Sequence, residues 1–145
     1  MSQSRRPEHP TAWTRGDCPG NGSVELSVVI LAKDEAANIA RAIASCGWAE
    51  QVVVVDSGSA DETVRIATHL GCDVIETDWP GHGLQRQRVL TMPVIRHEWV
   101  LWVDADEYIS PQLAVEVSDV LRTPVFGAYS IPLKLRFQGA WIDHC

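Results

Sequence analysis

The sequence lacks a long apolar run. The longest uninterrupted apolar stretches in its 145 residues span about six residues, whereas a helix needs about 20 to cross a bilayer. A membrane-spanning segment is therefore not expected. Residues 1–23 also lack an apolar core, so we expect no secretory signal there.

Basic residues and paired cysteines are also scarce. The 12 Lys and Arg stand against 19 Asp and Glu. This balance argues against nucleic-acid binding, which needs a concentrated basic surface. The four cysteines show no paired spacing. They indicate reduced thiols in a cytoplasmic protein, with no zinc site or disulfide framework.

What is present favours one α/β domain. Residues 1–24 are polar and rich in Pro and Gly, which predicts a flexible tail. Continuous apolar runs, typical of strands buried on both faces, occur at 26–31, 52–55 and 99–103, with a weaker run at 72–77. Helical periodicity lies between or after them, at 35–46, 60–70 and 111–122. This order predicts a mostly parallel sheet flanked by helices over residues 25–123.

Local signals place the ends of two helices. Ser59 followed by Glu62 predicts a capping box, and Gly71 suits the left-handed position that ends a helix. Ser110 before Pro111 predicts the start of the last helix.

Residues 124–145 change character. The segment 127–145 alternates and is interrupted by Pro132, which predicts one or two further strands, antiparallel at a sheet edge. The sequence stops after Cys145 without a capping element, so we expect the fold to be incomplete at the C-terminus.

Acidic residues gather where a ligand is expected. In an open α/β sheet, ligands bind beyond the carboxyl ends of the strands. Asp56 ends one apolar run, and Asp104 and Asp106 follow another. Asp56 suits hydrogen bonds to a ribose or a base. The alternative, a loop cap, is less favoured because Ser59 already supplies a cap. We expect the three aspartates to converge on one cavity.

The Asp104-x-Asp106 pair predicts a cation. Together with Glu107 these carboxylates repel one another beside an apolar strand unless positive charge joins them. Mg²⁺ and Mn²⁺ prefer oxygen ligands and often take one or two carboxylates plus substrate phosphates. The pattern therefore favours a metal–diphosphate site. A solvated acidic loop is the alternative interpretation.

The segment WPGHGLQRQRV (residues 79–89) offers positive charge. Gly81 and Gly83 predict a pliable loop, and Arg86 and Arg88 follow in a short helical stretch. A guanidinium there can contact phosphate oxygens. Solvated arginines on a surface loop are an equally good interpretation.

Together these blocks resemble glycosyltransferase family 2, which has the GT-A nucleotide-sugar-binding fold, and within it the lipopolysaccharide core branch. The resemblance covers residues 25–145. It is carried by LSVVILAKDEAANI, WAEQVVVVDSGSADETVRIA, W-x-G-x-G-x-Q-R, WVLWVDADEYISPQL and F-x-G-x-W-x-x-H. It implies an inverting, metal-dependent transfer of a sugar from a UDP-sugar to an acceptor hydroxyl.

The resemblance also implies roles by position. Nucleotide-sugar binding falls on Ala32, Glu35, Asp56, Arg86, Asp104 and Ala105. Asp106 is expected to hold Mg²⁺ or Mn²⁺ on the diphosphate. The branch has Asn where this sequence has Asp34, and Lys where it has Arg86. The catalytic base of the family is expected downstream of Cys145.

The implied partners are the UDP-sugar donor and a glycan or lipid-linked acceptor of the cell envelope. Because the acceptor can be lipid-linked, we keep peripheral contact with the inner face of the membrane as an alternative. We also keep an oligomer as an alternative, because the chain is expected to be incomplete.

A nucleotide- and metal-binding module without turnover is the main alternative function. A dinucleotide oxidoreductase ranks low because the first turn, LAKDEAAN, has no glycine. A phosphatase of the Asp-x-Asp type ranks low because Glu107-Tyr108 replaces its Gly-Thr.

Overall fold

A four-stranded parallel sheet forms the centre of the structure, a computed structural model that describes residues 23–78, 81–137 and 140–142. The strand order is β3-β2-β1-β4, and each neighbouring pair is parallel. The strands are β1 (Val24–Ala32), β2 (Ala49–Asp56), β3 (Asp73–Glu76) and β4 (Trp99–Asp104). The predicted α/β architecture is confirmed. The tail predicted for residues 1–24 lies mostly outside the described residues, and Val24 already belongs to β1.

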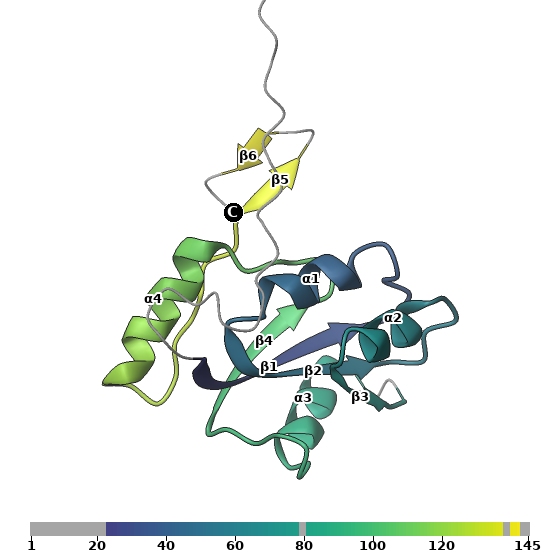
Figure 1. The fold of residues 1–145 in the computed structure, drawn as a ribbon, viewed down its shortest axis with the longest axis horizontal. Helices are drawn as coiled ribbons and strands as arrows, with labels where there is room; N and C mark the ends of the chain where they lie inside the picture. Colours follow the sequence, from purple (N-terminus) through teal and green to yellow (C-terminus); the bar gives the residue numbers. More distant parts are fainter. Residues whose placement is uncertain (1–22, 79–80, 138–139, 143–145) are drawn as a thin grey trace, which may run out of the picture.

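Helices cover both faces of this sheet (Figure 1). They are α1 (Ile39–Ser45), α2 (Thr63–His69), α3 (His82–Leu90) and α4 (Pro111–Arg122). Helices α1, α2 and α4 contribute to one hydrophobic cluster on one face of the sheet, whereas α3 packs against the opposite face. Within the described ranges, every helix is too short or too polar to cross a membrane.

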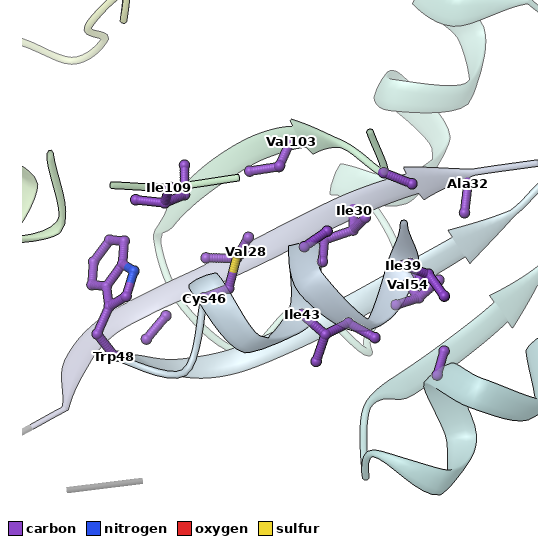
Figure 2. Close-up of a cluster of buried hydrophobic side chains, with 14 of the residues drawn as sticks. Val28, Ile30, Ala32, Ile39, Ile43, Cys46, Trp48, Val54, Val103 and Ile109 are labelled. Carbon is purple, nitrogen blue, oxygen red and sulfur yellow. The ribbon is translucent and has the colours of Figure 1, made fainter. Parts of the chain in front are cut away.

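The central strand β1 sends alternate side chains into two cores. Val28 and Ile30 join the larger cluster under α1, drawn in Figure 2, whereas Val29 and Leu31 pack with Val89 of α3. Successive side chains of a strand point to opposite faces. A strand buried on both faces therefore shows in the sequence as a continuous apolar run.

The larger core also encloses Trp48 and Cys46 (Figure 2). The indole Nε1 of Trp48 donates to the carbonyl of Ser45 at 3.0 Å, which satisfies the polar atom of a buried ring. Burial raises the pKa of the Cys46 thiol to about 12, so it stays protonated and unreactive at neutral pH. Cys46 and Cys72 are not joined to each other by a disulfide, and the other two cysteines lie outside the described residues.

The strand β4 departs from the expectation of burial on both faces. Its side chains from Trp99 to Trp102 are half-buried, and only Val103 is enclosed. In the described sheet β4 is an edge strand, and an edge strand leaves part of each side chain uncovered.

The capping box predicted at Ser59 and Glu62 is wrong. Glu62, the residue before α2, instead forms an exposed ion pair with Arg65, and the Ser59 hydroxyl donates to Asp56. The first turn of α2 is held by Asp61, whose Oδ1 accepts from the Thr63 N–H at 3.0 Å. Consequently α2 begins at Thr63, three residues later than predicted.

The other predicted helix signals are confirmed. The Ser110 Oγ accepts from the Leu113 N–H at 3.2 Å, and α4 has the predicted bounds. After α2, Gly71 has φ +81° and its N–H donates to the Thr68 carbonyl at 3.0 Å, while the Cys72 N–H reaches the Ala67 carbonyl at 3.2 Å. This pair of bonds closes the end of α2 as a Schellman motif.

The C-terminal strands are antiparallel, as predicted, but their predicted place is wrong. The strands β5 (Leu135–Phe137) and β6 (Ala140–Ile142) pair with each other in a separate two-stranded sheet. Among the described residues, they add no strand to the edge of the main sheet.

Replacing Gly71 by alanine tests the turn after α2. Because a Cβ is strained at φ +81°, we expect Gly71→Ala to lower the free energy of unfolding by about 1 kcal/mol. The matched control is Gly83, which lies inside α3 rather than in the predicted loop and has open space around its Cβ position. Gly83→Ala should leave stability unchanged or raise it by up to about 1 kcal/mol. Urea unfolding of both variants measures this, and an equal loss in both would contradict it.

Candidate functional site

The carboxyl ends of three strands lie level at one edge of the sheet. Ala32 of β1 pairs with Asp56 of β2, and Leu31 pairs with Asp104 of β4. Neighbouring strands lie about 4.8 Å apart, so the main chains of Asp56 and Asp104 are separated by about 10 Å across β1. The structure therefore brings these two predicted site residues to the same edge.

The end of β1 holds the loops of both neighbouring strands by main-chain bonds. The Leu31 carbonyl accepts from the Ala105 N–H at 3.0 Å, and the Ala32 carbonyl accepts from the Ser57 N–H at 2.9 Å. The predicted site residues Ala32 and Ala105 are buried, at 5% and 2% exposure. The side chains of these two alanines face the core, so only their main-chain groups contribute to the site.

The loops after β1 and β2 are bound to each other. The Asp34 N–H donates to Ser59 Oγ at 2.8 Å, and the Ala60 N–H donates to Asp34 Oδ1 at 2.7 Å. Asp34 has φ +54°, a conformation that Asp and Asn tolerate better than other side chains. The Oδ1 of an asparagine would accept the same bond, so Asp34 keeps the contact that the Asn expected from the resemblance to the lipopolysaccharide core branch would make.

A second pair of contacts extends this clamp. The Glu35 N–H donates to Thr63 Oγ1 at 2.8 Å, and the Ala36 N–H donates to Asp61 Oδ2 at 3.0 Å. Glu35 uses its carboxylate within its own loop, where Oε2 accepts from the Asn38 side chain at 2.8 Å. These bonds commit residues 33–38 to the loop, which explains why α1 begins at Ile39 and not at residue 35 as predicted.

The carboxylate of Asp56 serves its own loop. It is 1% exposed. Its Oδ2 accepts from the N–H groups of Gly58 and Ser59 at 3.0 and 2.8 Å, and its Oδ1 accepts from the Ser59 hydroxyl. The sequence argument that Ser59 caps the helix and leaves Asp56 for a ligand was therefore wrong. A direct contact between Asp56 and a nucleotide stays a prediction.

The acidic turn after β4 is closed by Glu107. The Asp104 N–H donates to Glu107 Oε2 at 3.0 Å, and the Glu107 N–H donates to the Asp104 carbonyl at 2.9 Å. This reciprocal pair satisfies two main-chain groups, as a capping box does at a helix start. The third carboxylate of the cluster thus has a structural task, which leaves the Asp104 and Asp106 side chains exposed at the edge.

Arg86 supplies positive charge at this turn. Its Nη2 lies 4.0 Å from Asp104 Oδ1, and its guanidinium lies 5.6 Å from the ring centroid of Trp102. The two charged side chains are 45% and 52% exposed. A long, exposed ion pair is weak. Arg86 is therefore placed to reduce the repulsion at the turn and is free to move to a bound anion.

A cavity of about 230 Å³ opens beside this edge, between the end of β3 and α3. Its lining residues are Thr77, Asp78, Gln85, Arg88, Val89 and Met92. It includes none of the three aspartates that were expected to share a cavity. The structure brings Asp56 and Asp104 to one edge of the sheet, but it buries the first and exposes the second.

Gln85 is a residue of this edge that the sequence analysis did not single out. Its side chain is 1% exposed, and its Nε2 donates to Ser57 Oγ at 2.8 Å and to Thr77 Oγ1 at 3.3 Å. It therefore joins α3 to the ends of β2 and β3. Its Oε1 is buried without a hydrogen-bond partner. The sequence signal was the Gln before Arg86 in W-x-G-x-G-x-Q-R.

The donor atoms at the turn fit a hard divalent cation that also binds a ligand. In the part of the chain that the structure describes, no three His, Cys, Asp or Glu side chains are grouped closely enough to hold a metal. Asp104 and Asp106 offer carboxylate oxygens, and Mg²⁺ or Mn²⁺ commonly takes one or two carboxylates with phosphate oxygens and water. The residues therefore fit a cation that arrives with a diphosphate.

Solved structures share this arrangement of strands and helices. Glucosyl-3-phosphoglycerate synthase from Mycobacterium tuberculosis in complex with UDP matches with a TM-score of 0.55 and 27% identity, over 81% of this chain and 47% of that one. Its complex with Mn²⁺, UDP and glucosyl-3-phosphoglycerate matches with a TM-score of 0.53 and 26% identity, over 80% and 46% of the two chains. Mannosyl-3-phosphoglycerate synthase from Rubrobacter xylanophilus matches with a TM-score of 0.57 and 28% identity, over 68% and 37%. The expected GT-A fold is confirmed.

Sequence relatives place the chain in its family. The model of glycosyl transferase family 2 matches residues 27–123. An uncharacterized glycosyltransferase of Rickettsia prowazekii is 38% identical over 119 residues, which cover 79% of this chain and 40% of the relative. One of Rickettsia felis is 43% identical over 100 residues, covering 68% and 35%. The chain belongs to glycosyltransferase family 2, and it spans about two fifths of the length of these relatives.

The clamp between the two loops predicts an acid dependence of stability. The Thr63 hydroxyl and then the Ala36 N–H lower the pKa of Asp61 from its ordinary value of 3.8. A lowered pKa in the folded state adds stability above the ordinary value, and this is lost as the pH falls through the folded value. We expect Asp61→Asn to lower the free energy of unfolding at neutral pH, and the difference from the parent to shrink below about pH 4.

Urea unfolding between about pH 7 and pH 3 measures this difference. Asp119→Asn is the matched control, because Asp119 forms only an exposed ion pair with Arg122 on α4 and such pairs contribute little. A difference between Asp61→Asn and the parent that is the same at every pH would contradict the assigned role of the Asp61 charge.

Proposed function

We propose that this chain binds the UDP-sugar donor of an inverting glycosyltransferase, at the edge formed by the ends of β1, β2 and β4. The observation that carries the proposal is the paired Asp104-x-Asp106 turn, exposed beside Arg86 at the same edge as the loop of Asp56. Such an edge is where open α/β sheets bind ligands. Family membership and the UDP complexes of similar structures support the choice of ligand.

The two ends of the proposed site have different characters. The clamped loops of Glu35 and Asp56 form a rigid side, suited to the base and ribose of the nucleotide. The turn of Asp104 and Asp106, with Arg86 beside it, forms a charged side suited to the diphosphate and sugar. A guanidinium binds phosphate oxygens through two parallel N–H donors. Arg86 can thus exchange its weak contact with Asp104 for a contact with the donor.

A divalent cation belongs to this proposal. Asp106 would hold Mg²⁺ or Mn²⁺ together with diphosphate oxygens, and the cation, when bound, would neutralise charge on the leaving diphosphate. The similar synthase bound to Mn²⁺ and UDP supports this choice. The turn after β4 would place the carboxylates of Asp104 and Asp106 beside the bound diphosphate.

The acceptor side extends the proposal beyond the described residues. We assign donor binding to residues 25–123 and the start of the acceptor side to residues 124–145. The acceptor is a glycan or a lipid-linked sugar of the cell envelope, as in the lipopolysaccharide core branch, and the reaction takes place on the cytoplasmic side of the membrane. The base that activates the acceptor hydroxyl is assigned to a part of the whole enzyme after Cys145.

Calorimetric titration with UDP, with and without Mn²⁺, tests the donor site. We expect Mn²⁺ to raise the affinity for UDP by at least about tenfold, which corresponds to about 1.4 kcal/mol. Asp106→Asn should abolish most of this gain, because a neutral amide is a poorer ligand for a hard cation. Mn²⁺ alone should bind weakly, because the protein offers at most two carboxylates.

The matched control is Asp119→Asn on α4, which removes one exposed carboxylate away from the edge and should leave the gain unchanged. Equal affinity for UDP with and without Mn²⁺ in the parent chain would sink the proposal. A second assay supplies a UDP-sugar and candidate acceptors. Metal-dependent binding of UDP together with no transfer of sugar in that assay would instead favour the alternative of a binding module without turnover.

A further inference from the structure

The acidic turn is approached by arginines from both faces of the sheet. Arg86 comes from α3, and Arg41 comes from α1 on the opposite face (Figure 1). The Arg41 Nη2 donates to the carbonyl of Asp106 at 3.1 Å. Its guanidinium lies 5.3 Å from the ring centroid of Tyr108. Arg41 therefore contacts the turn on both sides of Glu107, whereas Arg86 contacts only its first carboxylate.

The two arginines act on different parts of the turn. Arg86 pairs with a carboxylate, and this pair must separate if that carboxylate is to serve the donor. Arg41 binds a main-chain carbonyl, so it leaves the Asp106 carboxylate available for other contacts. Its contact with the Tyr108 ring restrains the guanidinium as well. Arg41 can thus remain in place while the turn binds a ligand.

We propose that Arg41 is a positioning residue that fixes the main chain of the Asp104–Tyr108 turn for metal and diphosphate binding. This inference rests on the proposed function and deepens it. A turn that is already ordered loses less conformational entropy when it binds. The effect of Arg41 should therefore fall on the metal-dependent part of binding and not on binding of the nucleoside.

The first measurement needs no ligand. The Glu107 N–H closes the turn by donating to the Asp104 carbonyl, whereas the Ala105 N–H donates to the Leu31 carbonyl of β1. We expect Arg41→Met to speed hydrogen exchange of the Glu107 amide by about tenfold, because the turn opens more often. The Ala105 amide, held by the sheet, should change little and serves as the internal reference.

The second measurement is the affinity for UDP with and without Mn²⁺. We expect Arg41→Met to bind UDP without metal within about twofold of the parent, and to lose most of an approximately tenfold gain from Mn²⁺. Arg41→Lys keeps the charge and can still donate to a carbonyl, so it should recover part of the gain. The matched control is Arg65→Met on α2, whose side chain is 72% exposed and pairs only with Glu62; it should match the parent in both measurements.

Two results would overturn the role of Arg41 alone. One is a parent chain that shows the Mn²⁺ gain and an Arg41→Met variant that keeps it in full. The other is an equal loss of UDP affinity with and without metal, which would indicate direct phosphate contact or general damage. If Arg41→Met does not fold, Arg41→Lys decides between the same outcomes. A parent chain without any Mn²⁺ gain would overturn the proposed function, and this inference with it.

Discussion

Two carbonyl groups at the end of β1 hold the candidate site together. The Leu31 carbonyl binds the turn that follows β4, and the next carbonyl, of Ala32, binds the loop that follows β2. These bonds extend the main-chain hydrogen bonding beyond the strand ends, so both loops take their positions from one strand. That strand is buried in two cores, with Val28 and Ile30 on one face and the residues alternating with them on the other. The geometry of the edge is thus a consequence of core packing.

The edge is rigid on one side and adaptable on the other. Between the loops after β1 and β2, side chains such as Asp34 and Thr63 bind main-chain groups of the opposite loop. Because each bond satisfies a main-chain group that would otherwise need water, the clamp resists opening. Beside the acidic turn, by contrast, Arg86 makes a long and exposed contact. A site that binds a nucleotide and then releases a charged leaving group benefits from this division.

The sequence predicted the elements well, because their signals are local. The apolar run of β1 and the Ser110-Pro111 start of α4 need only neighbouring residues to be recognised, and both predictions are confirmed. The placement of Asp56 and Asp104 at one edge also followed from the order of parallel strands. Alternating strands and helices leave few topologies, and right-handed crossovers reduce them further.

The side-chain partners could not be predicted, because they join distant parts of the chain. Ser59 has a suitable spacing for a cap, but its hydroxyl donates to the Asp56 carboxylate and accepts from the Asp34 N–H, which lies 25 positions away in the sequence. Arg41 and Asp106 are 65 positions apart in the sequence, and no local pattern relates them. The role of Glu107 in closing its own turn was not predicted either, because its carboxylate was grouped with those of Asp104 and Asp106.

A nuclear magnetic resonance titration of the chain with UDP and Mg²⁺, which follows every amide at once, tests the proposed donor site most directly. Binding at the proposed site should confine the shifts to the carboxyl edge of the sheet: residues 32–36, 56–60 and 104–108, and Arg86. Shifts centred instead on the opposite end of the sheet, where Gln51 binds Asp73, would contradict it. So would the absence of any shift at UDP concentrations that saturate related enzymes.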